Sequence, residues 1–318
     1  MEPMPDYLRE MLPDTEPQEL PVPTVVADDS VPDYLRGYFK EAPTTDPNNK
    51  PVLERWSFSD WSVWKACPYV LYARRIIKVA STGESEANVR GNAIHGFIEH
   101  RLNTGEVFGA SALDLLPKLT KTEAFLEYLE GFTAKDVPEK AWQVVDEIES
   151  GPWQITPEAK FYFDRNWEPT VFDDRWLTLI IDVLAIDHDQ KKILIVDWKT
   201  GKKNSVKHTQ QGSLYAVAMH HLYPDYDISV RFVYLDSEFE WAPTPDLTLS
   251  YRPDSKRLAK VKEIWADEGN KITSATKMDF APLYNPDQLV TVPPYLLPFL
   301  KDASNYDDAH FPAPIYAK

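Results

Sequence analysis

Two apolar segments that each carry an aspartate constrain the fold of this chain most strongly. Residues 175–187 read RWLTLIIDVLAID and residues 192–198 read KILIVDW. Runs of branched and aromatic residues of this length are typical of buried strands, and the few polar residues between them predict a turn. We therefore expect a β-hairpin in which Asp182 and Asp197 lie in or beside the protein core.

The register of this hairpin decides whether the two aspartates meet. A two-residue turn centred on Asp189 and Gln190 would place Asp182 directly opposite Asp197. Like charges that face each other on a half-buried sheet are destabilising, and burial increases the cost. A divalent cation between the carboxylates would remove this conflict. The alternative is a register shifted by one residue, with Asp182 at a bulge and Asp197 facing solvent, because DHDQ at residues 187–190 is not a strong turn sequence.

A lysine accompanies the second aspartate. Lys199 follows Asp197 by two residues, so a strand places both side chains on one face. Oxygen ligands select Mg²⁺ or Mn²⁺, and such a cation polarises a phosphate and lowers the pKa of a bound water. A nearby lysine could orient this water, or accept its proton if burial lowers the lysine pKa. Two facing acids and a lysine therefore favour a metal site for phosphodiester hydrolysis over an ordinary strand end.

The other patterns in the sequence predict a central mixed β-sheet flanked by helices, which is an α/β or α+β fold. Further strands are expected at 158–164 and 227–236, with 239–241 as a candidate partner of the latter. Apolar residues at helical spacing predict helices at 57–76, 88–103, 121–131, 138–149, 207–223 and 255–269. The segment from residue 281 onward is rich in proline and aromatic residues, and we expect it to wrap around the surface.

The first 51 residues differ from the rest, so we expect a mostly disordered tail at 1–51 and a folded domain at 52–318. Residues 1–50 hold eleven acidic and four basic residues, which accounts for −7 of the net charge of −16. The pentapeptide PDYLR occurs at 5–9 and again at 32–36. We interpret it as a repeated short helix that docks on a protein partner or on the chain itself, the alternative being a duplication without a role.

Four short motifs, which follow one another along the chain in the family's order, resemble those of the PD-(D/E)XK nuclease superfamily. The acid and lysine pattern IID…VDWKTGK resembles its core. Three flanking stretches are similar to the RecB-like exonuclease branch, which includes many phage exonucleases: SFSDWSVWKACPYVLYARR to its opening helix, RGNAIHGFIEH to its histidine helix and QQGSLYAVA to its Q-x-x-x-Y motif. Together the motifs cover roughly residues 56–235.

The resemblance implies a restriction-endonuclease-like core and a metal-dependent DNA exonuclease activity, with a role for each matching residue. The metal ligands would be His95, Asp182, Asp197 and the main-chain carbonyl of Trp198. Lys199 would act on the attacking water. Gln211 and Tyr215, one helical turn apart, would position the DNA strand and the active site. Glu158, which opens the strand before Asp182, falls where relatives often have a further acid.

The resemblance also raises the question of an iron–sulfur cluster, which several members of the branch bind through one early and three late cysteines. Cys67 stands at the early position and is the single cysteine of the chain. We therefore expect no cluster, Mg²⁺ or Mn²⁺ as the cofactor, and C-terminal packing around Phe299, Phe311 and Tyr316 in place of the cluster. Cys67 is then expected to be a small buried apolar residue.

The net charge of −16 argues against binding nucleic acid over the whole surface, but a locally basic cleft can still hold DNA. Candidate phosphate contacts are Lys202, Lys203, Lys207 and Arg75, with a solvated loop as the alternative for the lysines. No membrane span or secretory signal is expected, and we expect a cytoplasmic protein. Two other functions stay open: a structure-specific or restriction-like endonuclease, and a catalytically silent DNA-binding scaffold with a docking tail.

Overall fold

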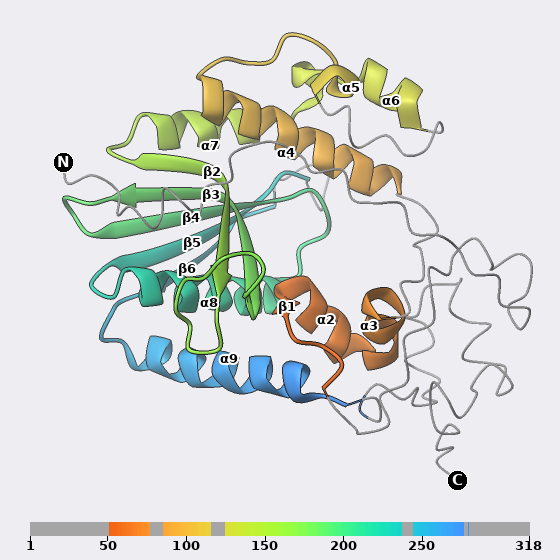
Figure 1. Ribbon diagram of the computed structural model, residues 1–318. Coiled ribbons are helices and arrows are strands. Elements are labelled where there is room, and N and C mark those ends of the chain that lie inside the picture. The colour runs from red at the N-terminus through yellow and green to blue at the C-terminus, as the bar shows by residue number, and fades with distance from the viewer. Residues whose placement is uncertain (1–50, 77–84, 116–124, 237–243, 277–278, 280–318) are drawn as a thin grey trace, which may run out of the picture. The chain divides into compact units, whose positions relative to one another are not determined.

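The computed structural model describes residues 51–76, 85–115, 125–236, 244–276 and 279 (Figure 1). They belong to two compact units. The first unit draws on Met1–Gly83, Asp173–Thr178 and Ala266–Lys318, and the second on Glu84–Phe172 and Leu179–Trp265. The PDYLR repeats, the candidate strand 239–241 and the segment from 281 lie outside the described residues. No described helix is long and apolar enough to cross a membrane.

The second unit contains most of a mixed β-sheet. Its strands are β2 (Gln154–Phe163), β3 (Leu177–Asp187), β4 (Lys192–Lys199), β5 (Asp227–Tyr234) and β6 (Leu247–Tyr251). β3 pairs with β4 and β5 with β6 in antiparallel fashion, whereas β4 and β5 are parallel. β2 also pairs with β3. This mixed sheet with flanking helices confirms the predicted fold class.

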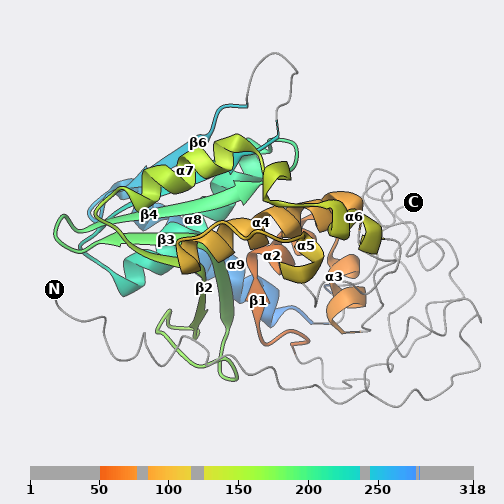
Figure 2. The same ribbon diagram turned by 90° about the horizontal axis from the view of Figure 1, so that it is seen from above.

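Helices of the second unit cover both faces of this sheet (Figure 1; Figure 2). On one face lie α4 (Glu86–Thr104) and α7 (Glu139–Glu149), and on the other lies α8 (Ser205–Leu222). Apolar side chains of α4 and α7 form a core with the sheet residues Val183, Ala185, Val196, Trp198 and Val233. The smaller helices α5 (Ala112–Leu115) and α6 (Leu126–Gly131) and the 3₁₀ helix Ala134–Asp136 follow α4.

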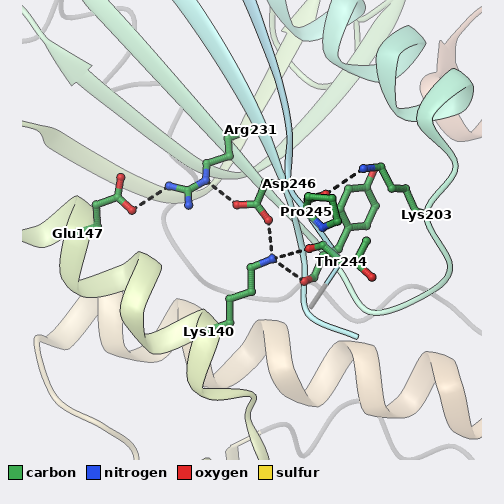
Figure 3. A network of polar contacts seen from close by, with 8 residues as sticks. Lys140, Glu147, Lys203, Arg231, Thr244, Pro245 and Asp246 are labelled. Carbon is green, nitrogen blue, oxygen red and sulfur yellow. Dashed lines mark hydrogen bonds and ion pairs between the residues drawn. The ribbon is translucent and has the colours of Figure 1, made fainter. Parts of the chain in front are cut away.

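A polar network attaches α7 to β5 and to the segment that leads into β6 (Figure 3). Lys140 Nζ donates to the carbonyl oxygens of Tyr234 and Thr244, both at 3.0 Å, and to Asp246 Oδ1 at 2.6 Å. Arg231 donates to Asp246 Oδ2 and to Glu147 Oε2, both at 2.9 Å. Asp246 is thus shared by two cations, which fixes the entry to the edge strand β6.

The first unit contains β1 (Trp56–Ser57), α2 (Phe58–Ala66), α3 (Pro68–Arg75) and the last part of α9 (Lys256–Ser274). The prediction of one helix at 57–76 is wrong, because the helix breaks at Cys67, whose φ of −163° is extended. Pro68 occupies the first position of α3, where its missing N–H costs nothing, and it restricts Cys67 to an extended conformation. Cys67 is buried, as predicted.

The β3–β4 hairpin has the predicted register. The ladder pairs Asp187 with Lys192 and continues to Val183 opposite Val196, so the next position in the same register places Asp182 across from Asp197. The predicted two-residue turn is wrong: residues 188–191 form a four-residue loop with the same centre. The loop is closed by a hydrogen bond from the Gln190 amide to Asp187 Oδ1 at 2.9 Å.

Candidate active site

Asp182 and Asp197 lie where β3 and β4 separate. The last ladder pair is Val183 with Val196, and beyond it the amide of Trp198 donates to Asp182 Oδ2 at 2.9 Å. The Asp182 carboxylate therefore takes the place of a main-chain acceptor. Asp197 is only 2% exposed, so the two acids lie at the edge of the core and not on a free strand end.

The proximity of Asp197 changes the proton affinity of Asp182. Burial, followed by the charge of the Asp197 carboxylate, raises the pKa of Asp182 from 3.8 to about 6. His95, the Trp198 amide and Lys199 oppose this rise in the pKa. The electrostatic conflict between the two aspartates that the sequence predicts is thus present in the fold.

Lys199 lies on the same face as Asp197. Its Nζ is 2.5 Å from Asp197 Oδ1 and donates to Gln211 Oε1 at 3.1 Å. The ammonium group also lies 5.4 Å from the ring centroid of Phe232. These contacts hold the lysine head beside the buried acid.

Gln211 and Tyr215 project from α8 onto Asp197. Gln211 Nε2 donates to Asp197 Oδ2 at 3.0 Å and to the Tyr215 hydroxyl at 2.6 Å. The Tyr215 hydroxyl lies 3.1 Å from both Asp197 Oδ2 and the carbonyl oxygen of Ile180, and its single proton can serve one of them at a time. Burial, followed by the charges of Asp197 and Asp182, raises the Tyr215 pKa well above 10, so the phenol stays protonated.

His95 approaches the acids from α4. Its Nδ1 lies 3.6 Å from Asp182 Oδ2. Gly91, one turn earlier, explains the approach: a Cβ at this position would lie 2.9 Å from Thr200 Oγ1, so the helix passes close to the end of β4. A glycine inside a helix is unfavourable by itself, and here a larger residue would require the Thr200 hydroxyl to shift.

The donor set can be compared with the needs of a hard divalent cation. Asp197 Oδ1 is buried and has no partner with hydrogen-bond geometry, although Lys199 Nζ is close enough for an ion pair. The carboxylates of Asp182 and Asp197 supply the oxygen donors that Mg²⁺ prefers. Among the residues that the structure describes, no group of three or more His, Cys, Asp or Glu side chains is arranged to hold a metal ion. The two carboxylates are therefore the part of this site whose chemistry fits a hard divalent cation.

Glu158 lies beside Glu99, an acid on the helix that carries His95. Its carboxylate is 3.7 Å from Lys160 Nζ and lies close enough to Glu99 to influence the pKa of that acid. Burial raises the Glu99 pKa, and the Glu158 charge adds to the rise. Glu158 also has a φ of 45°, which is unusual for a non-glycine residue. The sequence analysis did not assign Glu99 to this group; the available signal was its position one helical turn after His95.

The four candidate DNA contacts differ in their surroundings. Lys203 donates to the carbonyl of Pro245 at 2.9 Å and lies over the ring of Tyr234 (Figure 3). Arg75 belongs to the first unit and pairs with Asp60 at 3.0 Å. Lys202 and Lys207 are exposed. Lys203 and Arg75 would therefore have to leave existing partners to reach a phosphate, whereas Lys202 and Lys207 are accessible.

His208 is a residue beside the candidate site that the sequence analysis missed. It is buried, and its Nδ1 lies 2.7 Å from the Tyr234 hydroxyl. Burial and Lys199 lower its pKa to about 4, so the ring is neutral at pH 7. The signal was its spacing of three and seven residues from Gln211 and Tyr215, which places all three on one face of α8.

Comparison with known proteins supports this picture. A search of curated proteins found no match. Among solved structures, one described as "Crystal structure of SSO0001" is 8% identical and is matched over 68% of this chain and 75% of that chain, with a TM-score of 0.28, which is too low to carry an argument. The family model of the PD-(D/E)XK nuclease superfamily matches residues 55–285. The chain therefore belongs to the PD-(D/E)XK nuclease superfamily, a group of nucleases that generally use divalent metals such as Mg²⁺.

Proposed function

We propose that this protein is a Mg²⁺- or Mn²⁺-dependent DNA exonuclease of the RecB-like branch, acting in phage-type DNA degradation, recombination or repair. One observation carries the proposal. The buried Asp197 lies between Lys199 on its own strand and the Gln211–Tyr215 pair of α8, with Asp182 beside it. This arrangement unites the D-x-K and Q-x-x-x-Y motifs in one cluster.

In the proposed mechanism, the metal would be held by His95, Asp182, Asp197 and the carbonyl oxygen of Trp198. When bound, it would polarise the scissile phosphate and lower the pKa of a coordinated water. Gln211 and Tyr215 hold Asp197 Oδ2 through hydrogen bonds, and Lys199 Nζ lies beside Asp197 Oδ1. Lys199, held by Asp197 and Gln211, would orient the attacking water.

DNA would reach this site across the loop that follows β4. We propose Lys202 and Lys207 as phosphate contacts, with Lys203 and Arg75 contributing only if they exchange their internal partners for the phosphate. We also propose Glu158 as an accessory acid that acts from the cluster with Glu99 and Lys160, where it would influence His95 on the same helix as Glu99.

The test uses end-labelled linear DNA and closed circular DNA, each single- and double-stranded, with Mg²⁺ or Mn²⁺. We expect linear DNA to be degraded from its ends, and Asp197→Ala and Lys199→Ala to abolish this activity. The control is Lys191→Ala, which removes an exposed lysine paired with Asp225 in the loop at the opposite end of β4. This variant should degrade DNA at the rate of the unmodified protein.

The same assay separates the alternatives. Cutting of closed circles would replace the exonuclease with a structure-specific or restriction-like endonuclease. DNA binding without cleavage under any metal condition would indicate a catalytically silent scaffold. The presence of Asp182, Asp197 and Lys199 argues against a silent scaffold. The matches to the histidine helix and the Q-x-x-x-Y motif favour the exonuclease over an endonuclease.

The tail at 1–51, with its PDYLR repeats, is proposed as a docking segment separate from the nuclease domain at 52–318. Deletion of residues 1–50 should leave nuclease activity intact and abolish capture of a protein partner. Loss of the nuclease activity itself in the shortened protein would contradict the proposed division of the chain.

A further inference from the structure

Ile180 is an exposed apolar residue on an inner strand. Its side chain is 46% exposed, whereas its neighbours Leu179 and Ile181 are buried. Successive side chains of a strand point to opposite faces, so Ile180 lies on the same face of β3 as Asp182, two residues further on. Two residues of a strand span about 6.5 Å, which is the expected distance between the Ile180 and Asp182 Cα atoms.

The main chain of Ile180 is joined to the acid cluster. Its carbonyl oxygen lies 3.1 Å from the Tyr215 hydroxyl, which is also 3.1 Å from Asp197 Oδ2. Tyr215 is buried and therefore cannot move away without disturbing the core. Tyr215 therefore lies between the Ile180 main chain and Asp197, which places the segment that bears the exposed side chain beside the acid cluster.

Exposure of a single isoleucine is ordinary, and other apolar residues of the described chain are as exposed, including Val206, Val171 and Ile264. Ile180 differs from these three in its place, because it lies on the strand that carries Asp182. A substrate held at Asp182 and Asp197 would lie against it. An isoleucine side chain has no donor or acceptor, so it cannot contact a phosphate or read the edge of a base.

We infer that Ile180 packs against the base of the nucleotide next to the scissile phosphate and holds that nucleotide in place for hydrolysis. This inference rests on the proposed function. Every base has an apolar face, so a contact of this kind is tolerant of sequence, as stacking on exposed side chains is in other proteins that bind single strands. Ile180 is then a substrate contact that favours DNA with an intact base and makes no distinction among the four bases.

The test follows degradation of a single-stranded oligonucleotide that contains one internal abasic residue, labelled at either end and resolved to single nucleotides. The unmodified protein should slow about fivefold at the abasic residue, because the base contact is lost there. Ile180→Thr should slow about fivefold at every normal nucleotide and show no additional pause at the abasic one. Ile180→Leu, which keeps an apolar side chain, should resemble the unmodified protein.

The matched control is Ile264→Thr, which makes the same change at a residue of α9 with 45% exposure. It should degrade both normal and abasic positions like the unmodified protein. Equal rates for Ile180→Thr and the unmodified protein at normal nucleotides, or an equal pause of both at the abasic residue, would overturn the inference. If the unmodified protein degrades no DNA with either metal, the proposed nuclease function is contradicted, and the inferred base contact is contradicted with it. Thermal unfolding of each variant confirms that rates are compared between folded proteins.

Discussion

The amide of Trp198 donates to Asp182 Oδ2 at 2.9 Å, so the main chain of β4 holds the carboxylate of β3. The hydrogen bond begins where the ladder between these strands stops. It fixes Asp182 beside Asp197 even though the two charges repel. The folded chain thus holds the two acids together by main-chain geometry.

The first prediction concerns Asp182→Asn in metal-free protein. The Asp182 pKa is raised from 3.8 to about 6 in the fold, so the folded state binds more protons than the unfolded state between these values. Stability should therefore fall as pH rises through this window, by up to about 3 kcal/mol. The asparagine variant should lose this fall and, when assayed separately with Mg²⁺ or Mn²⁺, should also lack nuclease activity.

The measurement is urea unfolding at several pH values in the presence of a chelator. His208 acts in the opposite direction, since its lowered pKa of about 4 makes stability rise between pH 4 and 6.5. The difference between the variant and the unmodified protein isolates Asp182, because His208 is present in both. A difference that does not change with pH would contradict the prediction.

The second prediction concerns Tyr215→Phe. The hydroxyl serves Asp197 and the carbonyl of Ile180, and the site is buried, so its removal leaves acceptors with fewer partners. We expect the free energy of unfolding to fall by about 1–2 kcal/mol. The turnover rate should fall more than DNA affinity, because the Tyr215 side chain is buried and its hydroxyl contacts Asp197. Unfolding curves and single-turnover kinetics measure the two effects, and a loss of affinity alone would contradict them.

The third prediction concerns the approach of α4 to the end of β4. Gly91→Ala would place a Cβ 2.9 Å from Thr200 Oγ1, which displaces the helix that carries His95. Activity should fall, although alanine favours the helix by about 1 kcal/mol. The double variant Gly91→Ala with Thr200→Ala removes the clashing oxygen and should recover activity. Failure of this rescue, with Thr200→Ala active by itself, would show that the close passage is not the reason for the glycine.

The fourth prediction concerns the network of Lys140, Asp246 and Arg231 (Figure 3). Lys140→Met removes a donor that serves two carbonyl oxygens and one carboxylate, so we expect a loss of about 2 kcal/mol in the free energy of unfolding. Lys191→Met, which breaks an exposed pair with Asp225, should change it by less than about 0.5 kcal/mol. Chemical denaturation of both variants provides the comparison, and equal losses would contradict it.

Local patterns in the sequence determined the hairpin and its register. The apolar residues on both strands and a turn centred on Asp189 and Gln190 predicted the pairing that places Asp182 across from Asp197, and the ladder has that register. The two-residue period of a strand predicted that Lys199 and Asp197 share a face, as their 2.5 Å contact shows. These features could be predicted because each depends on residues close together in the chain.

The tertiary structure decided which distant groups complete each local pattern. Trp198 could be recognised as part of a motif from the sequence. Its amide donates to Asp182 because the β3–β4 ladder ends at the pair Val183–Val196, just before these two residues. Glu158 was predicted as an acid of the site, and packing brings it beside Glu99 of α4, whose pKa it raises. Lys203 looked like a free basic residue, yet it binds the carbonyl of Pro245. Sequence sets the side chains that a strand or helix presents, whereas packing alone sets which side chains of other elements lie within the few ångströms over which hydrogen bonds and ion pairs act.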